Sequence, residues 1–248
     1  MKEAKDLFSA QSATYAAHRP VYPDALYRFL YSHCRHFHTA WDCGTGNGQV
    51  ALRLSEKFTH VHSTDISANQ VNHAAQSPNI TYHICRAEQT PLQDGIADLI
   101  TVGTAIHWFD FGSFYEEVRR VAKPGAFFAA WCYAPSHSTP AIDDILHRFY
   151  TDIVGGYWDA ERKYVDEQYR TIPFPFEEVQ TPGIEIKTRW KRVHFIGYLN
   201  SWSAVQHYIE KNKHNPVALI EEELYANWKD EEEVDITFPL FIRAGYVK

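Results

Sequence analysis

Five short apolar runs, separated by helical patterns and turns, fill the first half of the chain. They lie at residues 38–43, 59–65, 80–86, 97–103 and 126–133. Runs of this length that alternate with helical segments are typical of β-α-β units, whose strands are parallel and whose sheet is covered on both faces. The pattern therefore predicts an α/β fold with a mostly parallel sheet and helices on both of its faces.

The second half of the chain has a looser pattern. Residues 140–154 and 198–228 have helical periodicity, residues 155–183 are rich in Gly, Pro and aromatic side chains, and strands are expected near 184–195 and 234–247. No internal repeat or low-complexity linker divides the chain, so we expect one domain. Its expected parts are an N-terminal arm and first helix at 1–35, a core at 36–134, an insertion or cap between the fifth and sixth strands at 135–184, and C-terminal strands and helices at 185–248.

Charge and composition narrow the classes of partner. The formal net charge is −7, and acidic residues cluster at 221–223 and 231–233, which disfavours a nucleic-acid partner because phosphates need a basic surface. The N-terminus lacks the apolar core of a signal peptide, and no apolar run approaches the ~20 residues that span a bilayer. The four cysteines form no C-x-x-C pair. We expect a cytoplasmic protein without a membrane partner, either a monomer or a homodimer.

A glycine turn follows the first apolar run, in the sequence DCGTGNGQ at residues 42–49. Such a turn between a strand and a helix lets the backbone approach a ligand closely. The dinucleotide pattern G-x-G-x-x-G would require glycine where Gln49 stands, and the carboxylate of Asp42 would repel a pyrophosphate. Asp65, at the end of the second apolar run, is placed to accept the hydroxyl groups of a ribose. These residues predict a nucleoside cofactor without a pyrophosphate.

Several further segments occur in a characteristic order: STDIS at 63–67, RAEQTPL at 86–92, TAIHWFD at 104–110 and VAKPGAFFAAW at 121–131. Two more segments belong to this set, YAAHRPVYP at 15–23 and GYLNSWSAV at 197–205. Together with the glycine turn, these segments make the chain resemble class I S-adenosylmethionine-dependent methyltransferases. Within that class it is similar to the trans-aconitate-methyltransferase-like (methyltransferase type 11) group. The resemblance covers nearly the whole chain. It implies a Rossmann-like seven-stranded sheet, S-adenosyl-L-methionine as cofactor, and S-adenosyl-L-homocysteine as product.

The resemblance also assigns residues to parts of the cofactor. The glycine turn is assigned to the methionine part, Asp65 to the ribose, and Ile66 to the adenine face. Asp42 is expected to position the turn through bonds from backbone N–H groups or to bind the ammonium group of the cofactor. Glu88 is expected to accept from the adenine amino group or from backbone partners, or else to be an exposed carboxylate at a helix start. The cofactor-binding residues implied in this way are Tyr15, Arg19, Asp42, Gly44, Thr45, Gly46, Gln49, Asp65, Ile66, Ala87, Glu88 and Thr104.

The methyl acceptor is expected beyond the end of the fourth strand, because ligands of open α/β sheets lie outside the carboxyl ends of the strands. His107 is the catalytic candidate there. It can act as a general base, orient the substrate or bond to backbone, and we favour the orienting role. Arg19 of the arm can bind a carboxylate bidentately. Further aromatic residues of the insertion, Tyr157, Trp158, Phe174 and Phe176, are expected to shape the acceptor pocket. The expected substrate-side residues are Tyr22, His107, Trp108 and Trp202.

Missing signatures narrow the chemistry further. The pairs His36/His38 and His60/His62 have the spacing of metal ligands on a strand, but no carboxylate or cysteine stands at a matching position, so we expect no metal. The fourth strand does not end in (D/N)PP(Y/F), and the chain has no Pro-Cys pair, which disfavours a nucleobase acceptor. We predict methyl transfer to a small molecule, with a carboxylate among the candidates. The alternative is a catalytically inactive protein that binds S-adenosylmethionine or S-adenosylhomocysteine. A nicotinamide oxidoreductase is disfavoured by Gln49.

Overall fold

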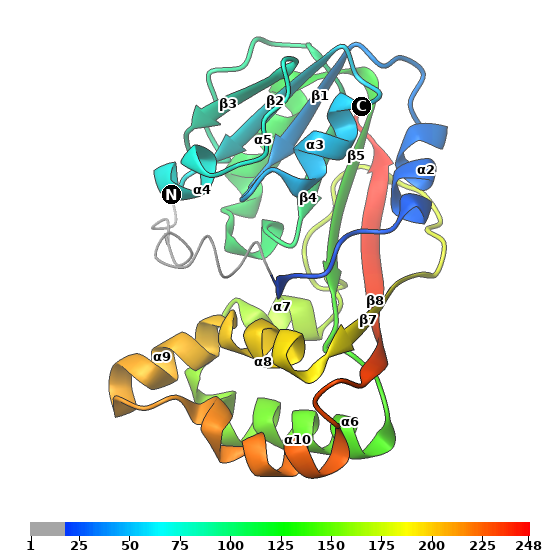
Figure 1. Ribbon diagram of the computed structural model, residues 1–248. Coiled ribbons are helices and arrows are strands. Elements are labelled where there is room, and N and C mark those ends of the chain that lie inside the picture. Colours follow the sequence, from blue (N-terminus) through cyan, green and yellow to red (C-terminus); the bar gives the residue numbers. More distant parts are fainter. Residues whose placement is uncertain (1–17) are drawn as a thin grey trace.

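A twisted sheet forms the centre of the molecule, and the computed structural model describes residues 18–248 of the chain (Figure 1). Within these residues the sheet has eight strands in the order β3-β2-β1-β4-β5-β8-β6, and β7 also pairs with β8. The strands are β1 Thr39–Cys43, β2 His60–Asp65, β3 Ile80–Ile84, β4 Ala97–Gly103, β5 Ala122–Tyr133, β6 Glu177–Glu178, β7 Ile184–Lys191 and β8 Glu233–Tyr246.

The first five strands are parallel to their neighbours, whereas β8 is antiparallel to β5, β6 and β7. This confirms the Rossmann-like, mostly parallel sheet. Seven strands were expected, and the eighth is the two-residue strand β6. It is too short to leave a pattern in the sequence. Strand β5 begins four residues earlier than its apolar run, because Ala122 pairs with Ala97 across an irregularity in the β4–β5 ladder.

Helices cover both faces of the sheet and also form a separate layer beyond its end (Figure 1). They are α2 Asp24–Ser32, α3 Gln49–Ser55, α4 Ala68–Asn72, α5 Phe111–Val121, α6 Pro140–Arg148, α7 Arg162–Asp166, α8 Arg192–Asn200, α9 Ser203–Asn212 and α10 Glu221–Asn227. Short 3-10 turns occur at η2 Ile106–Trp108, η4 Gly155–Tyr157 and η5 Pro216–Leu219, and a π turn at η3 Phe149–Ile153.

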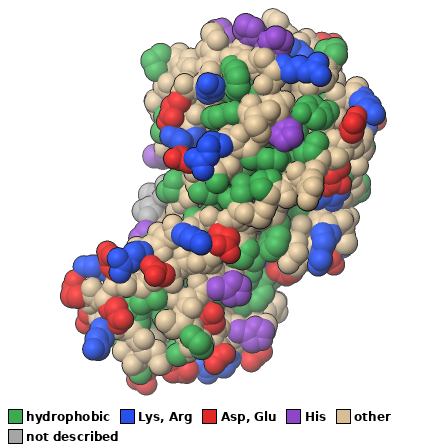
Figure 2. All heavy atoms as spheres, turned by 90° about the vertical axis from the view of Figure 1, so that its right-hand side faces the viewer, with side chains coloured by type: hydrophobic (Ala, Val, Ile, Leu, Met, Phe, Trp, Pro, Cys, Tyr) green, Lys and Arg blue, Asp and Glu red, His purple; other side chains and the backbone are tan. Residues whose placement is uncertain are grey.

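The layer beyond the sheet, here called the helical lobe, contains α6, α8, α9 and α10 (Figure 1). Helix α6 follows β5, whereas the other three lie between β7 and β8. The expected insertion and the expected C-terminal segment therefore both supply helices to this lobe. Basic and acidic side chains are interspersed on the face shown in Figure 2, and exposed ion pairs such as Arg148–Glu223 (2.6 Å) and Lys191–Glu231 (2.5 Å) join neighbouring elements.

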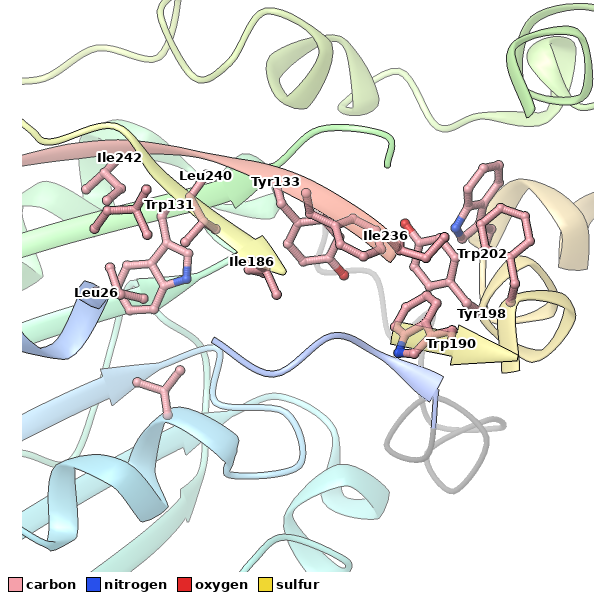
Figure 3. Close-up of a cluster of buried hydrophobic side chains, with 14 of the residues drawn as sticks. Leu26, Trp131, Tyr133, Ile186, Trp190, Tyr198, Trp202, Ile236, Leu240 and Ile242 are labelled. Carbon is pink, nitrogen blue, oxygen red and sulfur yellow. The ribbon is translucent and has the colours of Figure 1, made fainter. Parts of the chain in front are cut away.

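Successive residues of the central strands point to opposite faces, so each strand contributes to two buried clusters. Leu99 and Phe127 belong to the cluster on the α2 side, whereas Ile100 and Phe128 belong to the cluster on the α5 side. The first cluster continues without a break into the helical lobe, from Trp131 as far as Trp202 (Figure 3). The lobe and the sheet therefore share one hydrophobic core.

Asp98 connects three neighbouring strands of the sheet. One carboxylate oxygen accepts the backbone N–H groups of His38 and Thr39, at 3.1 and 2.9 Å, just where β1 begins. The other oxygen lies 2.7 Å from Nζ of Lys123 on β5, and only 5% of the Asp98 side chain is exposed. A nearly buried carboxylate with three donors is strongly coupled to its surroundings.

We expect Asp98→Ala to lower the free energy of unfolding by about 2–3 kcal/mol, because it leaves two backbone donors and a lysine without their acceptor. The matched control is Lys123→Met, which should cost only about 1 kcal/mol because the lysine is partly exposed to solvent. Urea denaturation measures both values. Equal losses for the two variants would contradict the role assigned to the backbone donors.

Candidate functional site

A pocket of about 180 Å³ opens at the carboxyl ends of the parallel strands, between the sheet and the helical lobe. Its wall includes the last residues of β1, β2 and β4 and residues of α7 and of the α8–α9 connection. Eleven of the expected cofactor-binding and substrate-side residues lie in this wall: Arg19, Gly44, Gly46, Asp65, Ile66, Ala87, Glu88, Thr104, His107, Trp108 and Trp202.

Four other candidates lie behind the wall rather than in it: Tyr22, Asp42, Thr45 and Gln49. Tyr15 lies outside the described residues. Among the expected aromatic residues of the insertion, Trp158 is in the wall, whereas Phe174 and Phe176 pack against Phe128 in the core on the α5 side. Tyr157 packs against Tyr208 of α9, with 4.8 Å between ring centroids.

The glycine turn depends on left-handed backbone conformations. Gly44, Gly46 and Gly48 have φ angles of 66°, 55° and 77°, which favour glycine. A Cβ atom on Gly44 would lie 2.6 Å from Cβ of Ala105, and one on Gly48 would lie 2.4 Å from the Tyr82 hydroxyl. At Gly46 no described residue lies within 4 Å of such an atom. Two of the glycines therefore allow close packing, while the backbone at Gly46 faces open space in the pocket.

Asp65 fastens this turn to the end of β2. One carboxylate oxygen accepts the backbone N–H of Gly46 at 2.8 Å, and the other accepts the N–H of Ser67 at 2.9 Å. An ionised carboxylate offers about four acceptor positions, and these two backbone bonds use one on each oxygen. The side chain therefore supports the turn from within the wall of the pocket.

Asp42 lies beneath the turn and is 1% exposed. Burial raises the pKa of its carboxyl group to about 6, although hydrogen bonds from the hydroxyls of Thr45 (2.5 Å) and Thr101 (2.8 Å) favour the ionised form. These bonds connect the turn to β1 and β4. Asp42 thus contacts the turn through the hydroxyl group of Thr45, whereas bonds from backbone N–H groups were expected.

Glu88 joins the loop after β3 to the start of α5. Its carboxylate accepts the backbone N–H of Asp110 at 2.9 Å and pairs with Nε of Arg86 at 3.2 Å. Only 6% of the side chain is exposed, so Glu88 is not the exposed carboxylate at a helix start that was one of the alternatives. Asp110 in turn caps α5 by accepting the N–H of Ser113.

Thr104 has an unusual backbone conformation at the end of β4. Its φ angle is 55°, which is strained for a β-branched residue. Its N–H donates to the carbonyl of Trp131 at 2.7 Å, and its hydroxyl lies 3.0 Å from the hydroxyl of Tyr22. The ring of Tyr22 packs edge-on against Trp131, with 5.5 Å between centroids. Tyr22 therefore supports a strained residue of the wall from behind.

His107 is 5% exposed and is held by a residue from a distant part of the chain. Its Nδ1 lies 2.7 Å from the hydroxyl of Tyr169, which is fully buried and has a φ angle of 60°. The imidazole also packs beside Trp108, with 4.9 Å between ring centroids. The sequence contains no signal for the Tyr169 contact, because 62 residues separate the two partners.

The segment 18–22 is held across the edge of the pocket by two side chains. Arg19 donates to the hydroxyl of Tyr133 at 2.8 Å and to the carbonyl of Ser201 at 3.0 Å. The amide of Gln49 donates to the carbonyl of Pro20 and accepts the N–H of Tyr22, at 3.4 and 3.2 Å. The side chain of Gln49 thus binds the arm, and that of Arg19 joins β5 to the helical lobe.

The wall also contains residues that the sequence analysis did not single out. The polar and charged ones are Thr64, Ser67, Gln70, Arg86, Asp159, Arg162 and Ser203. Arg162 and Asp159 come from the irregular stretch before and within α7, where neither a motif nor a periodicity identifies single residues.

Residues 18–248 contain no group of three or more His, Cys, Asp or Glu side chains that could hold a metal ion. None of the helices in this range has both the length and the apolar character that a membrane span requires.

The raised pKa of Asp42 predicts a pH-dependent stability. The folded chain holds the Asp42 proton more tightly than the unfolded chain, so protonation stabilises the fold, and this contribution is lost as pH rises through about 6. Lowering the pH from about 7 to about 5 should stabilise the wild type by about 1 kcal/mol relative to Asp42→Asn, which cannot titrate. Denaturant titrations without cofactor measure this difference. A constant difference between the two proteins at both pH values would contradict the prediction.

Proteins with similar sequences and structures include several that are named as methyltransferases. The methyltransferase domain family matches residues 41–130, which contain the glycine turn, Asp65 and His107. A Dictyostelium discoideum protein named as a methyltransferase is 33% identical over 245 residues, covering 96% of this chain and 93% of that protein. The narrower trans-aconitate group stays a prediction.

A solved structure described as a type II methyltransferase from Anaeromyxobacter dehalogenans has a TM-score of 0.86 and 40% sequence identity, covering 92% of this chain and 98% of that one. The YcgJ protein of Bacillus subtilis, at 16% identity and a TM-score of 0.53 over 91% of this chain and 98% of its own, shares the fold alone. With the strand order, the glycine turn and Asp65 in place, the chain belongs to the class I S-adenosylmethionine-dependent methyltransferases.

Proposed function

We propose that this protein transfers a methyl group from S-adenosylmethionine to a small molecule bound between the sheet and the helical lobe. The observation that carries the proposal is the composition of the pocket wall, which combines two chemically different groups of residues. We assign the glycine turn, Asp65 and Ile66 to one end of the pocket, and His107 with three tryptophans, Trp108, Trp158 and Trp202, to the other.

The first end fits a nucleoside cofactor with a methionine part. The open space at Gly46 lets a ligand approach the backbone, and the acceptor positions of Asp65 match the two hydroxyls of a ribose. Ile66 is 39% exposed beside Asp65 and offers an apolar surface to a base. When bound, S-adenosylmethionine would supply an activated methyl group on a sulfonium. The strained Thr104 would lie against its methionine part.

The second end fits a small acceptor with an apolar or aromatic body. The rings of Trp158 and Trp202 lie 5.4 Å apart, and those of His107 and Trp108 lie 4.9 Å apart. Such walls exclude water and align an acceptor, which is the main contribution that a protein makes to a displacement at a methyl group. His107 would orient the acceptor while Tyr169 fixes its ring. It would take a proton only if the accepting atom is protonated.

The charge of the surface supports a small-molecule acceptor rather than a nucleic-acid partner, and we propose a cytoplasmic location. The net charge is −7, and on the face shown in Figure 2 acidic and basic side chains are interspersed. A nucleic acid would need a continuous basic surface. A catalytically inactive protein that binds the cofactor is the alternative, and a transfer assay separates it from the proposed function.

The first test combines binding with transfer. S-adenosylhomocysteine should bind, and NADH should not, in calorimetric titrations of the wild type. Asp65→Ala should weaken binding of S-adenosylhomocysteine by at least about tenfold, since each lost charge-assisted hydrogen bond is worth ~1.5–3 kcal/mol. Asp65→Asn keeps one acceptor oxygen and should be intermediate. The control is Asp94→Asn, an exposed carboxylate that pairs with Arg120 away from the pocket and should change nothing.

In the transfer assay, wild-type protein, S-adenosylmethionine labelled at its methyl group and fractionated metabolite extract should yield labelled product. Asp65→Ala should reduce the yield strongly. Tight binding of S-adenosylhomocysteine without labelled product in any fraction would favour the inactive binding protein. Unchanged affinity in both Asp65 variants would refute the ribose assignment.

The role of His107 can then be measured with the acceptor found in this way. Glutamine at this position keeps a hydrogen-bonding amide but cannot act as a base. For an orienting role we expect His107→Gln to slow transfer about tenfold or less. The wild-type rate should then stay flat between about pH 6 and about pH 8, because no proton transfer limits it. A loss of about a thousandfold with unchanged cofactor affinity would show base catalysis instead.

A further inference from the structure

Arg162 of α7 lies in the wall at the tryptophan-lined end of the pocket, and 23% of its side chain is exposed. Its Nε donates to the hydroxyl of Tyr150 at 2.8 Å and pairs with the carboxylate of Asp166 at 3.2 Å. The guanidinium lies over the ring of Trp158, 4.5 Å from its centroid, and 5.2 Å from that of Tyr150. These contacts hold the side chain in one orientation.

The anchoring contacts use only one of the three nitrogens of the guanidinium. Within residues 18–248 the hydrogen bonds and the ion pair of the Arg162 side chain are all made by Nε, so both terminal nitrogens keep their donors for another partner. Burial lowers the pKa of Arg162, but Tyr150 and Asp166 more than offset this effect, so the pKa is raised overall and the group stays charged. A purely structural role would explain the contacts of Nε. It would not explain why a charged guanidinium group with two unused terminal nitrogens lines a cavity.

Two other charged side chains of the wall, Asp159 and Arg19, make contacts with residues other than Arg162. Asp159 is the acidic residue of the wall nearest in sequence, but its carboxylate lies 3.8 Å from Nδ1 of His207, and its side chain is only 11% exposed. Arg19, which was expected to bind a carboxylate, directs its terminal nitrogens to Tyr133 and Ser201. The third arginine of the wall, Arg86, pairs through Nε with Glu88 at 3.2 Å. At Arg162, the side-chain contacts within residues 18–248 are made by Nε and not by the two terminal nitrogens.

We propose that Arg162 binds a carboxylate of the methyl acceptor through its two terminal nitrogens, while the apolar body of that acid packs against Trp158 and Trp202. A planar guanidinium matches a carboxylate with two parallel hydrogen bonds, which a lysine cannot reproduce. This inference rests on the proposed function, because it names the acceptor class of the same pocket. It assigns Arg162 to substrate recognition and leaves His107 to orient the accepting atom.

The test uses wild-type protein saturated with S-adenosylhomocysteine. Benzoate, phenylacetate and octanoate are titrated by calorimetry up to millimolar concentration, each beside its primary amide, which has nearly the same shape without the charge. Phenyl phosphate serves as a second oxyanion. We expect at least one of the acids to bind and its amide to bind at least about tenfold more weakly, since a charge-assisted pair is lost.

Three variants assign the binding to Arg162. Arg162→Gln should weaken binding of the acid at least about tenfold, and Arg162→Lys should restore only part of it, because the lysine keeps the charge but not the fork. The matched control is Arg148→Gln, an exposed arginine of the same lobe that pairs with Glu223 and should leave binding unchanged. The affinity for S-adenosylhomocysteine should be the same in all four proteins, and circular dichroism checks that each is folded.

Several outcomes would overturn the inference. These are failure of every acid to bind, equal binding of acid and amide, preference for phenyl phosphate over each acid, or full acid binding by folded Arg162→Gln. If the wild type binds S-adenosylhomocysteine and any of these results is found, only the acceptor class is wrong. If the wild type does not bind S-adenosylhomocysteine at all, the proposed function itself fails.

Discussion

The pairing of the long strand β8 with β5 along one part of its length and with β7 along the other is the constraint on which the pocket depends. Residues 240–246 pair with β5 inside the sheet, whereas residues 233–240 pair with β7. Because β8 runs past the end of β5, it carries β7 and the helices that follow it beyond the carboxyl ends of the parallel strands (Figure 1). The helical lobe is thereby held opposite the glycine turn, and the shared hydrophobic core makes this position rigid.

The two ends of the pocket are built by different kinds of interaction. At the proposed cofactor end, backbone groups in left-handed conformations are joined by carboxylates, such as Asp65 between Gly46 and Ser67. At the proposed acceptor end, side chains from separate elements meet, as in the stack of Arg162 on Trp158 beside Trp202. A single substitution can therefore change the wall at the proposed acceptor end more easily than it can change the backbone at the proposed cofactor end.

The sequence could predict most of the fold, because parallel strands leave continuous apolar runs and their ends can be located within a few residues. Asp65 and Gly46 were predictable for a related reason: a strand end and a tight turn constrain residue type locally. Gln49 stands within the same motif, yet its amide binds the arm at Pro20 and Tyr22. Local sequence could not reveal this, because the partner lies on another segment whose position depends on the whole fold.

The sequence by itself determined the fold class and the place of the glycine turn, since both depend on short-range patterns of hydrophobicity and glycine. Its motifs, taken in order, also identified the methyltransferase class. Only the tertiary structure decided how the acceptor end is built. His107 meets Tyr169 across 62 residues, and Arg162 keeps its terminal nitrogens for the cavity because Tyr150 and Asp166 take Nε. The physical reason is that a side chain's hydrogen-bond capacity is used or left over according to which distant groups the folded chain brings within about 3 Å.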